Sequence, residues 1–188
     1  MEQYNLKRNA EGYPDPTAYE AEKRLRGKRS KMVGALFEQM IEVSCEYYKE
    51  LGLAVIEKTP EPIKVLSGLD KKGQFKACFR KKAQPDYKGV LYGGKMVAFE
   101  AKHTDSEKIT YNAVTEWQNE ALEACHNMGA ECFVLVSFGF CDFYKIPWME
   151  WYEMPMLYGR KYMKRSELEK FRIEEKGNIL YFLYEPKE

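Results

Sequence analysis

Three side chains between Gln84 and Thr104 have the types and spacing for metal-assisted chemistry. Asp86 comes early in this segment, and Glu100 and Lys102 occupy alternate positions near its end. Alternate residues of a strand share a face, so Glu100 and Lys102 should point the same way. A hairpin turning at Gly93–Gly94 would bring Asp86 back toward Glu100. Two carboxylates and an amine would then converge on one point, where they could hold a hard divalent cation and activate a water molecule.

The helices that must position this hairpin can be predicted from capping residues and apolar spacing. A capping pattern at Thr17 predicts a short basic helix that stops near Gly27. Ser30 would cap a longer helix that ends at Gly52. Further helical segments are predicted at 115–128, capped by Thr115, at 148–154 and after Ser166, with a polar connector at 105–114.

Runs of β-branched and aromatic residues predict the remaining strands, at 53–57, 63–66, 74–79, 132–137, 141–146 and 178–184. Helices alternating with strands, together with two hairpins, predict an α/β fold with a mixed central sheet flanked by helices. A chain of 188 residues favours one domain. We therefore expect an N-terminal arm with the short basic helix over 1–26 and a single domain over 27–188.

Charge is segregated along the chain, although the formal net charge is only +1. The run Lys23–Lys31 holds six basic residues and no acidic one, and Lys71–Lys88 holds seven basic residues. Such runs can form a basic groove for nucleic acid, or they can be solvated faces. The predicted hairpin at about 62–82 is basic at its tip and far end, with Phe75 and Phe79 interleaved, so it could be an arm that inserts along a nucleic acid.

The cysteines do not indicate a zinc site or a disulfide framework. None of the five forms a Cys-x-x-Cys pair, and the chain has only two His. Cys45, Cys125 and Cys132 lie in apolar periodic segments and are expected to be buried. An odd count without a framework favours a reducing compartment. Without a signal-peptide core or a membrane-spanning run, we expect a cytoplasmic protein with no membrane partner.

Two polar residues outside the hairpin could support the chemistry. Glu38 sits beside the apolar stripe of its helix; it could be a surface residue, or it could lean toward the metal. Gln118 falls in the first turn of the helix at 115–128, from which it could project toward the Glu-x-Lys strand.

Pro85-Asp86, followed after thirteen residues by Glu100-Ala101-Lys102, resembles the PD-(D/E)xK pattern of restriction-endonuclease-like nucleases. The chemistry fits phosphodiester hydrolysis, because each carboxylate and the Ala101 carbonyl can give a hard oxygen to Mg²⁺. Lys102 can orient or deprotonate the attacking water. The bare pattern can also arise by chance, as a turn Asp and an edge-strand Glu/Lys pair.

A closer resemblance covers about two thirds of the chain, from about Gly27 to Trp148. The helix with Leu36-Phe37-Glu38, the segment 54–62, the interposed hairpin, Asp86-Tyr87-x-Gly89, Phe99-Glu100-Ala101-Lys102-x-Thr104, Gln118 and the strand 132–137 are similar in order and spacing to the RecU-type Holliday junction resolvases, phage-encoded relatives included. These pieces together are far more specific than the bare pattern.

The resemblance implies a homodimeric endonuclease that nicks four-way DNA junctions in pairs with Mg²⁺, or with Mn²⁺ as its substitute. It implies that Asp86, Glu100 and Lys102 are catalytic, with Glu38 and Gln118 in accessory roles. It also implies that the hairpin at 62–82 is a protruding stalk that enters the junction. Residues expected to contact DNA are Arg26, Lys28, Arg29, Lys58, Lys71, Lys72, Lys76, Arg80, Lys81 and Lys82.

One position departs from the family pattern: Pro85 stands where the family usually has Thr, so a hydroxyl that could help to hold the metal or a water is missing. Two other functions stay open. The chain could be a nuclease for flaps, other branched DNA or duplex ends, or a non-catalytic DNA-binding recombination accessory.

Overall fold

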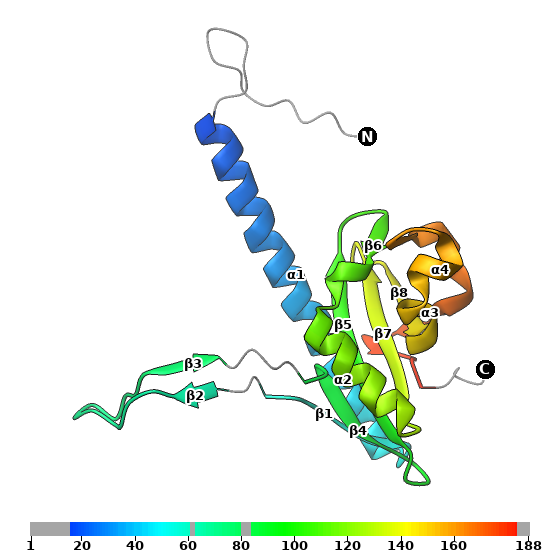
Figure 1. Cartoon of the computed structure of the whole chain (residues 1–188), viewed down its shortest axis with the longest axis horizontal. Helices are drawn as coiled ribbons and strands as arrows, with labels where there is room; N and C mark the ends of the chain where they lie inside the picture. The colour runs from blue at the N-terminus through cyan, green and yellow to red at the C-terminus, as the bar shows by residue number, and fades with distance from the viewer. Residues whose placement is uncertain (1–15, 61–62, 80–83, 184–188) are drawn as a thin grey trace, which may run out of the picture.

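The fold is described from a computed structural model, over residues 16–60, 63–79 and 84–183 (Figure 1). Its centre is a mixed sheet with the strand order β1-β4-β5-β7-β8-β10. The strands are β1 (Ala54–Lys58), β4 (Tyr87–Leu91), β5 (Met96–Thr104), β7 (Glu131–Phe138), β8 (Asp142–Pro147) and β10 (Arg172–Ile173). β5 and β7 run parallel, and the other neighbouring pairs are antiparallel. Helices flank this sheet, which confirms the predicted fold class.

One face of the sheet is covered by α1 (Pro16–Glu50), whose C-terminal half is amphipathic. Phe37, Ile41 and Tyr48 are buried in one core cluster with Tyr87 and other residues of the sheet. Burial of such large side chains stabilises a core by roughly 1.5–3 kcal/mol each. The N-terminal half extends away from the sheet in Figure 1.

The prediction of two helices separated near Gly27 is wrong, because α1 is continuous from Pro16 to Glu50. A glycine inside a helix costs only about 1 kcal/mol relative to alanine, and no proline follows to end the helix. The helix therefore passes through the expected boundary at residue 26, while the division into an arm and a single domain stays a prediction.

The opposite face of the sheet is covered by α2 (Glu116–Asn127), α3 (Trp148–Tyr152) and α4 (Met154–Tyr158). Leu122, Val134, Trp148 and Trp151 are buried in the second core cluster. Thr115 caps α2 as predicted. In the part of the chain that the structure describes, no helix combines the length and the apolar character needed to cross a membrane.

The basic hairpin is present, with β2 (Ile63–Val65) paired to β3 (Ala77–Phe79). Both strands are shorter than predicted. In Figure 1 the hairpin projects away from the body beside β1, as expected of a stalk, and its residues 63–78 are exposed.

The segments after β5 differ most from prediction. The connector at 105–114 contains β6 (Lys108–Thr110), which pairs with β9 (Tyr162–Lys164), and the 3₁₀ helix η1 (Tyr111–Ala113). In place of a helix after Ser166 there are two 3₁₀ turns, η2 (Arg165–Glu167) and η3 (Glu169–Phe171).

The predicted final strand at 178–184 is reduced to β12 (Ile179–Leu180), paired with β11 (Glu175–Lys176) outside the central sheet. Positive φ angles at Gly177 and Asn178 turn the chain into this local hairpin. The chain then packs on α1, where the Tyr48 hydroxyl donates to the Leu180 carbonyl over 2.6 Å. Leu180 and Phe182 of this segment therefore belong to the core under α1 rather than to another strand of the central sheet.

Candidate active site

The β4–β5 hairpin brings the predicted carboxylates together. Tyr87 pairs with Phe99, so Asp86 lies beside Glu100. The backbone N–H of Asp86 donates to Glu100 Oε1 over 3.2 Å, and the Ala101 N–H donates to Asp86 Oδ2 over 3.1 Å. The register set by the Gly93–Gly94 turn therefore fixes the relation of the two acids, as the sequence predicted.

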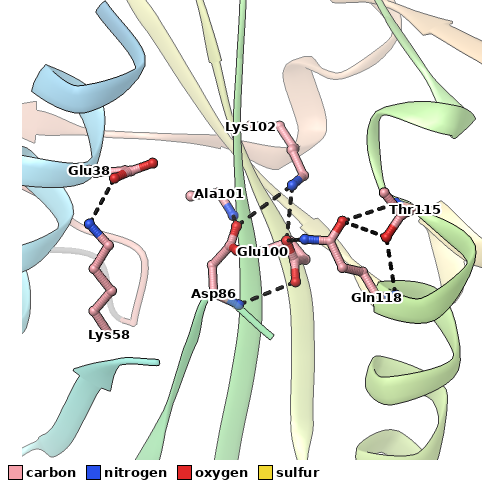
Figure 2. A network of polar contacts seen from close by, with 8 residues as sticks. All are labelled: Glu38, Lys58, Asp86, Glu100, Ala101, Lys102, Thr115 and Gln118. Carbon is pink, nitrogen blue, oxygen red and sulfur yellow. Dashed lines mark hydrogen bonds and ion pairs between the residues drawn. The ribbon is translucent and has the colours of Figure 1, made fainter. Parts of the chain in front are cut away.

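Lys102 completes the cluster (Figure 2). Its Nζ lies 3.0 Å from Glu100 Oε2 and 3.7 Å from Asp86 Oδ2. Glu100 and Lys102 are on β5 and Asp86 directly precedes β4, so the paired strands hold the geometry of the cluster. The predicted convergence of two carboxylates and an amine is thus present in the structure.

Glu100 is fully buried. Burial raises the pKa of Glu100 to about 9, the neighbouring Asp86 adds to the rise, and Lys102 opposes it. Without another cation, the site therefore favours a proton on Glu100 at neutral pH. A divalent cation would remove this preference, because its charge stabilises both carboxylates in the ionised form.

Gln118 reaches Glu100 from α2, as its position in the first turn of the helix predicted. Its Nε2 donates to Glu100 Oε2 (Figure 2). Its Oε1 accepts from the backbone N–H of Thr115 over 3.0 Å and from the Thr115 hydroxyl over 3.1 Å. Because the oxygen accepts two donors from Thr115, the amide is oriented with its N–H toward the carboxylate.

Glu38 approaches from α1, on the other side of Ala101 from Glu100 (Figure 2). Its carboxylate accepts from Lys58 Nζ over 2.7 Å, and Lys58 also pairs with Glu42 over 3.0 Å. The hydrogen bond to Glu38 helps to raise the pKa of Lys58 above its ordinary value. Lys58 is thus paired with two carboxylates from α1, so contact with DNA would have to compete with them.

The remaining basic residues fall into three groups. Lys71, Lys72 and Lys76 are exposed on the β2–β3 hairpin, and Lys28 and Arg29 are exposed on α1. Arg80, Lys81, Lys82 and the side chain of Arg26 lie outside the described residues. The two described groups lie on different elements, the β2–β3 hairpin and the helix α1.

The donor set fits Mg²⁺ in type and number. In the described segments no three His, Cys, Asp or Glu side chains are grouped to hold a metal. Mg²⁺ does not require such a cage, because it commonly takes one or two carboxylates and completes its shell with water and substrate phosphate. Asp86, Glu100 and the Ala101 carbonyl are donors of that kind. Pro85 is buried next to Asp86 and offers no hydroxyl.

Sequence reasoning missed two features of the site. It recognised Thr115 as a helix cap but not as the residue that orients Gln118, although Thr-x-x-Gln is itself a capping-box pattern. It also missed a hollow beside Ala101, to which Lys31, Gly34 and His103 contribute. No local pattern indicates that hollow, because it forms only where α1 crosses the end of β5.

The mixed sheet and its Asp86, Glu100 and Lys102 cluster place the protein in the PD-(D/E)xK class of nucleases. The sequence model of the RecU family, Recombination protein U, matches residues 32–185. The chain belongs to the RecU family.

Relatives of this chain carry the name Holliday junction resolvase RecU. The Staphylococcus saprophyticus protein is 30% identical over 82% of this chain and 76% of its own length. The Bacillus pumilus protein is 29% identical over 93% of this chain and 89% of its own length. Among solved structures, Hjc, a Holliday junction resolvase from Archaeoglobus fulgidus, shares 16% identity over 60% of this chain and 75% of that chain, with a TM-score of 0.38.

Proposed function

We propose that this protein is a metal-dependent endonuclease that resolves four-way DNA junctions by paired nicking as a homodimer. The observation that carries the proposal is the convergence of Asp86, Glu100 and Lys102 at one end of the β4–β5 hairpin. Membership of the RecU family supports the substrate, since relatives in that family are named for Holliday junctions.

Asp86, Glu100 and the Ala101 carbonyl would hold Mg²⁺, or Mn²⁺ as its substitute. When bound, the ion would supply Lewis-acid stabilisation of charge on the scissile phosphate. Lys102 is close to both carboxylates, where its ammonium group could donate to the attacking water and orient it. Its positive charge also offsets charge that develops on the phosphate oxygens.

Gln118 and Glu38 would act around this centre. Gln118 fixes the rotation of the Glu100 carboxylate through its side-chain N–H, which would leave the remaining carboxylate lone pairs for the metal. Glu38 comes from the opposite side and is held by Lys58. In this proposal Lys58 positions Glu38 as well as contacting DNA.

DNA contacts would come from the exposed cations of two elements. Lys71, Lys72 and Lys76 on the β2–β3 hairpin would enter the junction, and Arg80, Lys81 and Lys82 stay predicted DNA contacts outside the described residues. Arg26, Lys28 and Arg29 on α1 would hold phosphates of a duplex arm. Such contacts supply affinity and register without reading sequence.

An exposed apolar strip supports the homodimer. Val55 pairs with Val90, and Val90 pairs with Met96, so the three side chains share one face of the sheet. All three are exposed, at 52%, 49% and 39%. A two-fold axis through this strip would present two active sites to a junction that has two-fold symmetry. Light scattering on Val90→Glu tests this surface: we expect a monomer, and an unchanged dimer would exclude it.

The decisive experiment is cleavage of a mobile four-way junction in Mg²⁺, with linear duplex and flap DNA as controls. We expect symmetrical nicks on the junction and little cutting of the controls. Equal cutting of flaps or duplex would assign the site to another DNA substrate. If no branched DNA is nicked in Mg²⁺ or Mn²⁺, the result would favour the alternative function, a non-catalytic DNA-binding accessory protein.

A further inference from the structure

A hollow of about 240 Å³ lies between α1 and the end of β5, next to the carboxylate cluster. Its lining residues are Ser30, Lys31, Gly34, Phe37, Glu38, Ala101, Lys102 and His103. Ala101 and Lys102 therefore border both the hollow and the candidate active site. A group held in the hollow would be the immediate neighbour of the group that reacts.

The chemistry of the lining suits a phosphate. Lys31 brings positive charge and Ser30 brings a hydroxyl, whereas Lys102 is already paired with Glu100 and Asp86. Glu38 is the acidic residue among the described lining, and Lys58 already neutralises it over 2.7 Å. The volume is below the roughly 300–1,000 Å³ of sites for drug-sized ligands, so it suits a single sugar-phosphate unit.

The far wall is held in place by His103. Its side chain is only 4% exposed, with Nδ1 3.2 Å from Ser137 Oγ and Nε2 3.2 Å from Asp105 Oδ1. Both ring nitrogens thus have hydrogen-bond partners, one on β7 and one in the turn after β5. The wall is therefore a fixed boundary of the hollow.

Gly34 keeps the near wall open. A Cβ built on Gly34 meets no heavy atom within 4 Å, so no packing contact requires a glycine there. Its φ is not positive, so the backbone does not require one either. A glycine in a helix costs about 1 kcal/mol relative to alanine. Because Gly34 has no side chain, the hollow that it lines together with Ala101 stays open.

We propose that this hollow binds the phosphodiester next to the scissile one on the strand being cut, with Lys31 as its counter-charge and Gly34 as the residue that admits it. The proposal rests on the proposed function, because it assumes that the neighbouring cluster cuts DNA.

Filling the hollow is the first test. Gly34→Leu should lower kcat/KM for junction cleavage about tenfold or more, the cost expected when a charge-assisted contact is lost. Gly27→Leu is the matched control, since Gly27 is also in α1 with nothing near its Cβ but does not line the hollow. It should cut like the native chain. If Gly34→Leu does not fold by circular dichroism, Gly34→Met replaces it, because its unbranched side chain is also long enough to fill the hollow. Native cleavage by the folded variant would overturn the proposal.

A chemical test identifies the phosphate. Junctions are made with one neutral methylphosphonate at each position flanking the cut. When the methylphosphonate replaces the phosphate that the hollow binds, kcat/KM of the native protein should fall about tenfold relative to the unmodified junction. The same replacement should change kcat/KM of Lys31→Ala little, because that variant has already lost the contact. Lys49→Ala, an exposed lysine of the same helix, should keep the full loss. If the loss is as large in Lys31→Ala as in the native chain, Lys31 does not face that phosphate and the proposal is wrong.

Binding without cleavage separates this proposal from the proposed function. With Ca²⁺ in place of Mg²⁺, the slope of log K for DNA against log salt should fall by about 1 in Lys31→Ala and stay unchanged in Lys49→Ala. A native chain that nicks no junction in Mg²⁺ would contradict the proposed function, whereas an unchanged slope in Lys31→Ala would contradict the phosphate contact.

Discussion

Gln118 donates its side-chain amide to the fully buried carboxylate of Glu100, and the same side chain completes the capping box at the start of α2. The capping box that begins α2 therefore also holds the carboxylate of Glu100, the candidate catalytic acid. Thr115 takes part in both roles, because its hydroxyl and its backbone N–H both donate to Gln118 Oε1.

Replacing Gln118 by Met should reduce junction cleavage in Mg²⁺ by about 10–100-fold, because the Glu100 carboxylate loses the donor that fixes its rotation. Junction affinity measured in Ca²⁺ should change little. Initial rates of nicking check this, with Glu120→Gln on the exposed side of α2 as the control. A native rate in Gln118→Met would show that the contact is only structural.

Replacing Asp86 by Asn should lower cleavage by at least about 10²-fold while junction binding persists, because the amide keeps the shape but loses the charge. Gel shifts in Ca²⁺ and nicking assays in Mg²⁺ measure the two effects separately. Glu50→Gln, exposed at the end of α1, controls for loss of one negative charge. Simultaneous loss of binding would mean that Asp86 holds the fold of the hairpin.

The metal-free protein should become less stable as pH rises. The pKa of Glu100 is about 9 in the folded chain, against about 4.3 when exposed. Between these values the folded state binds a proton that the unfolded state has released, so the free energy of unfolding falls with pH, by at most about 1.4 kcal/mol per pH unit. Urea unfolding in EDTA measures the slope, and Glu100→Gln should flatten it.

Added Mg²⁺ should stabilise the protein more at pH 8.5 than at pH 6, because the ion must displace the proton from Glu100. The shift in Tm with Mg²⁺ at the two pH values measures this. An equal shift at both would place the ion away from Glu100.

Replacing Lys71, Lys72 and Lys76 by Ala should reduce the slope of log K against log salt for junction DNA by about 3, since each lysine would release a counterion on binding phosphate. Preference for the junction over linear duplex should fall as well. Deleting 64–78 should abolish that preference while leaving nicking of simple duplex intact.

The control triple carries Ala at Lys49, Lys95 and Lys176, which lie on the body of the protein. It should keep the native slope. Equal effects of the two triples would show that net charge, rather than the hairpin, governs binding.

Replacing Gly89 by Ala should destabilise the fold by at least about 2–3 kcal/mol. A Cβ at Gly89 would lie 2.0 Å from the Val55 carbonyl oxygen and 2.6 Å from the Ile56 Cα, so β1 and β4 would have to separate. Gly68→Ala, where a Cβ meets nothing within 4 Å, should change stability by less than about 0.5 kcal/mol. Urea unfolding compares the two; a small effect at Gly89 would mean that β1 can move freely.

The parts of the site that the sequence predicted are those set by local rules. A Gly-Gly turn and the two-residue period of strands are enough to bring Asp86 to Glu100 and Lys102. The pairing of Glu38 with Lys58 depends on where α1 crosses β1, and no local pattern contains that information. The helix break at Gly27 was wrong because the small cost of one glycine does not outweigh the good helix formers on both sides of it.

The final strand was wrong for a tertiary reason. Its apolar residues matched a strand pattern, but Leu180 and Phe182 are buried with Tyr48 against α1. The same pattern of apolar side chains fits burial in a sheet or burial against a helix, so the sequence alone could not distinguish a further strand of the sheet from a segment that packs on a helix.

Because α1 is one continuous helix, it fixes the distance between its basic N-terminal residues and the candidate active site. With a rise of about 1.5 Å per residue, Lys28 stands about 15 Å and Arg24 about 21 Å along the axis from Glu38. A duplex arm that lies along these cations would be held a set number of base pairs from the cutting site, at about 3.4 Å per step. Inserting or removing residues in the exposed half of the helix would alter that measure and would also rotate the charges about the axis by about 100° per residue.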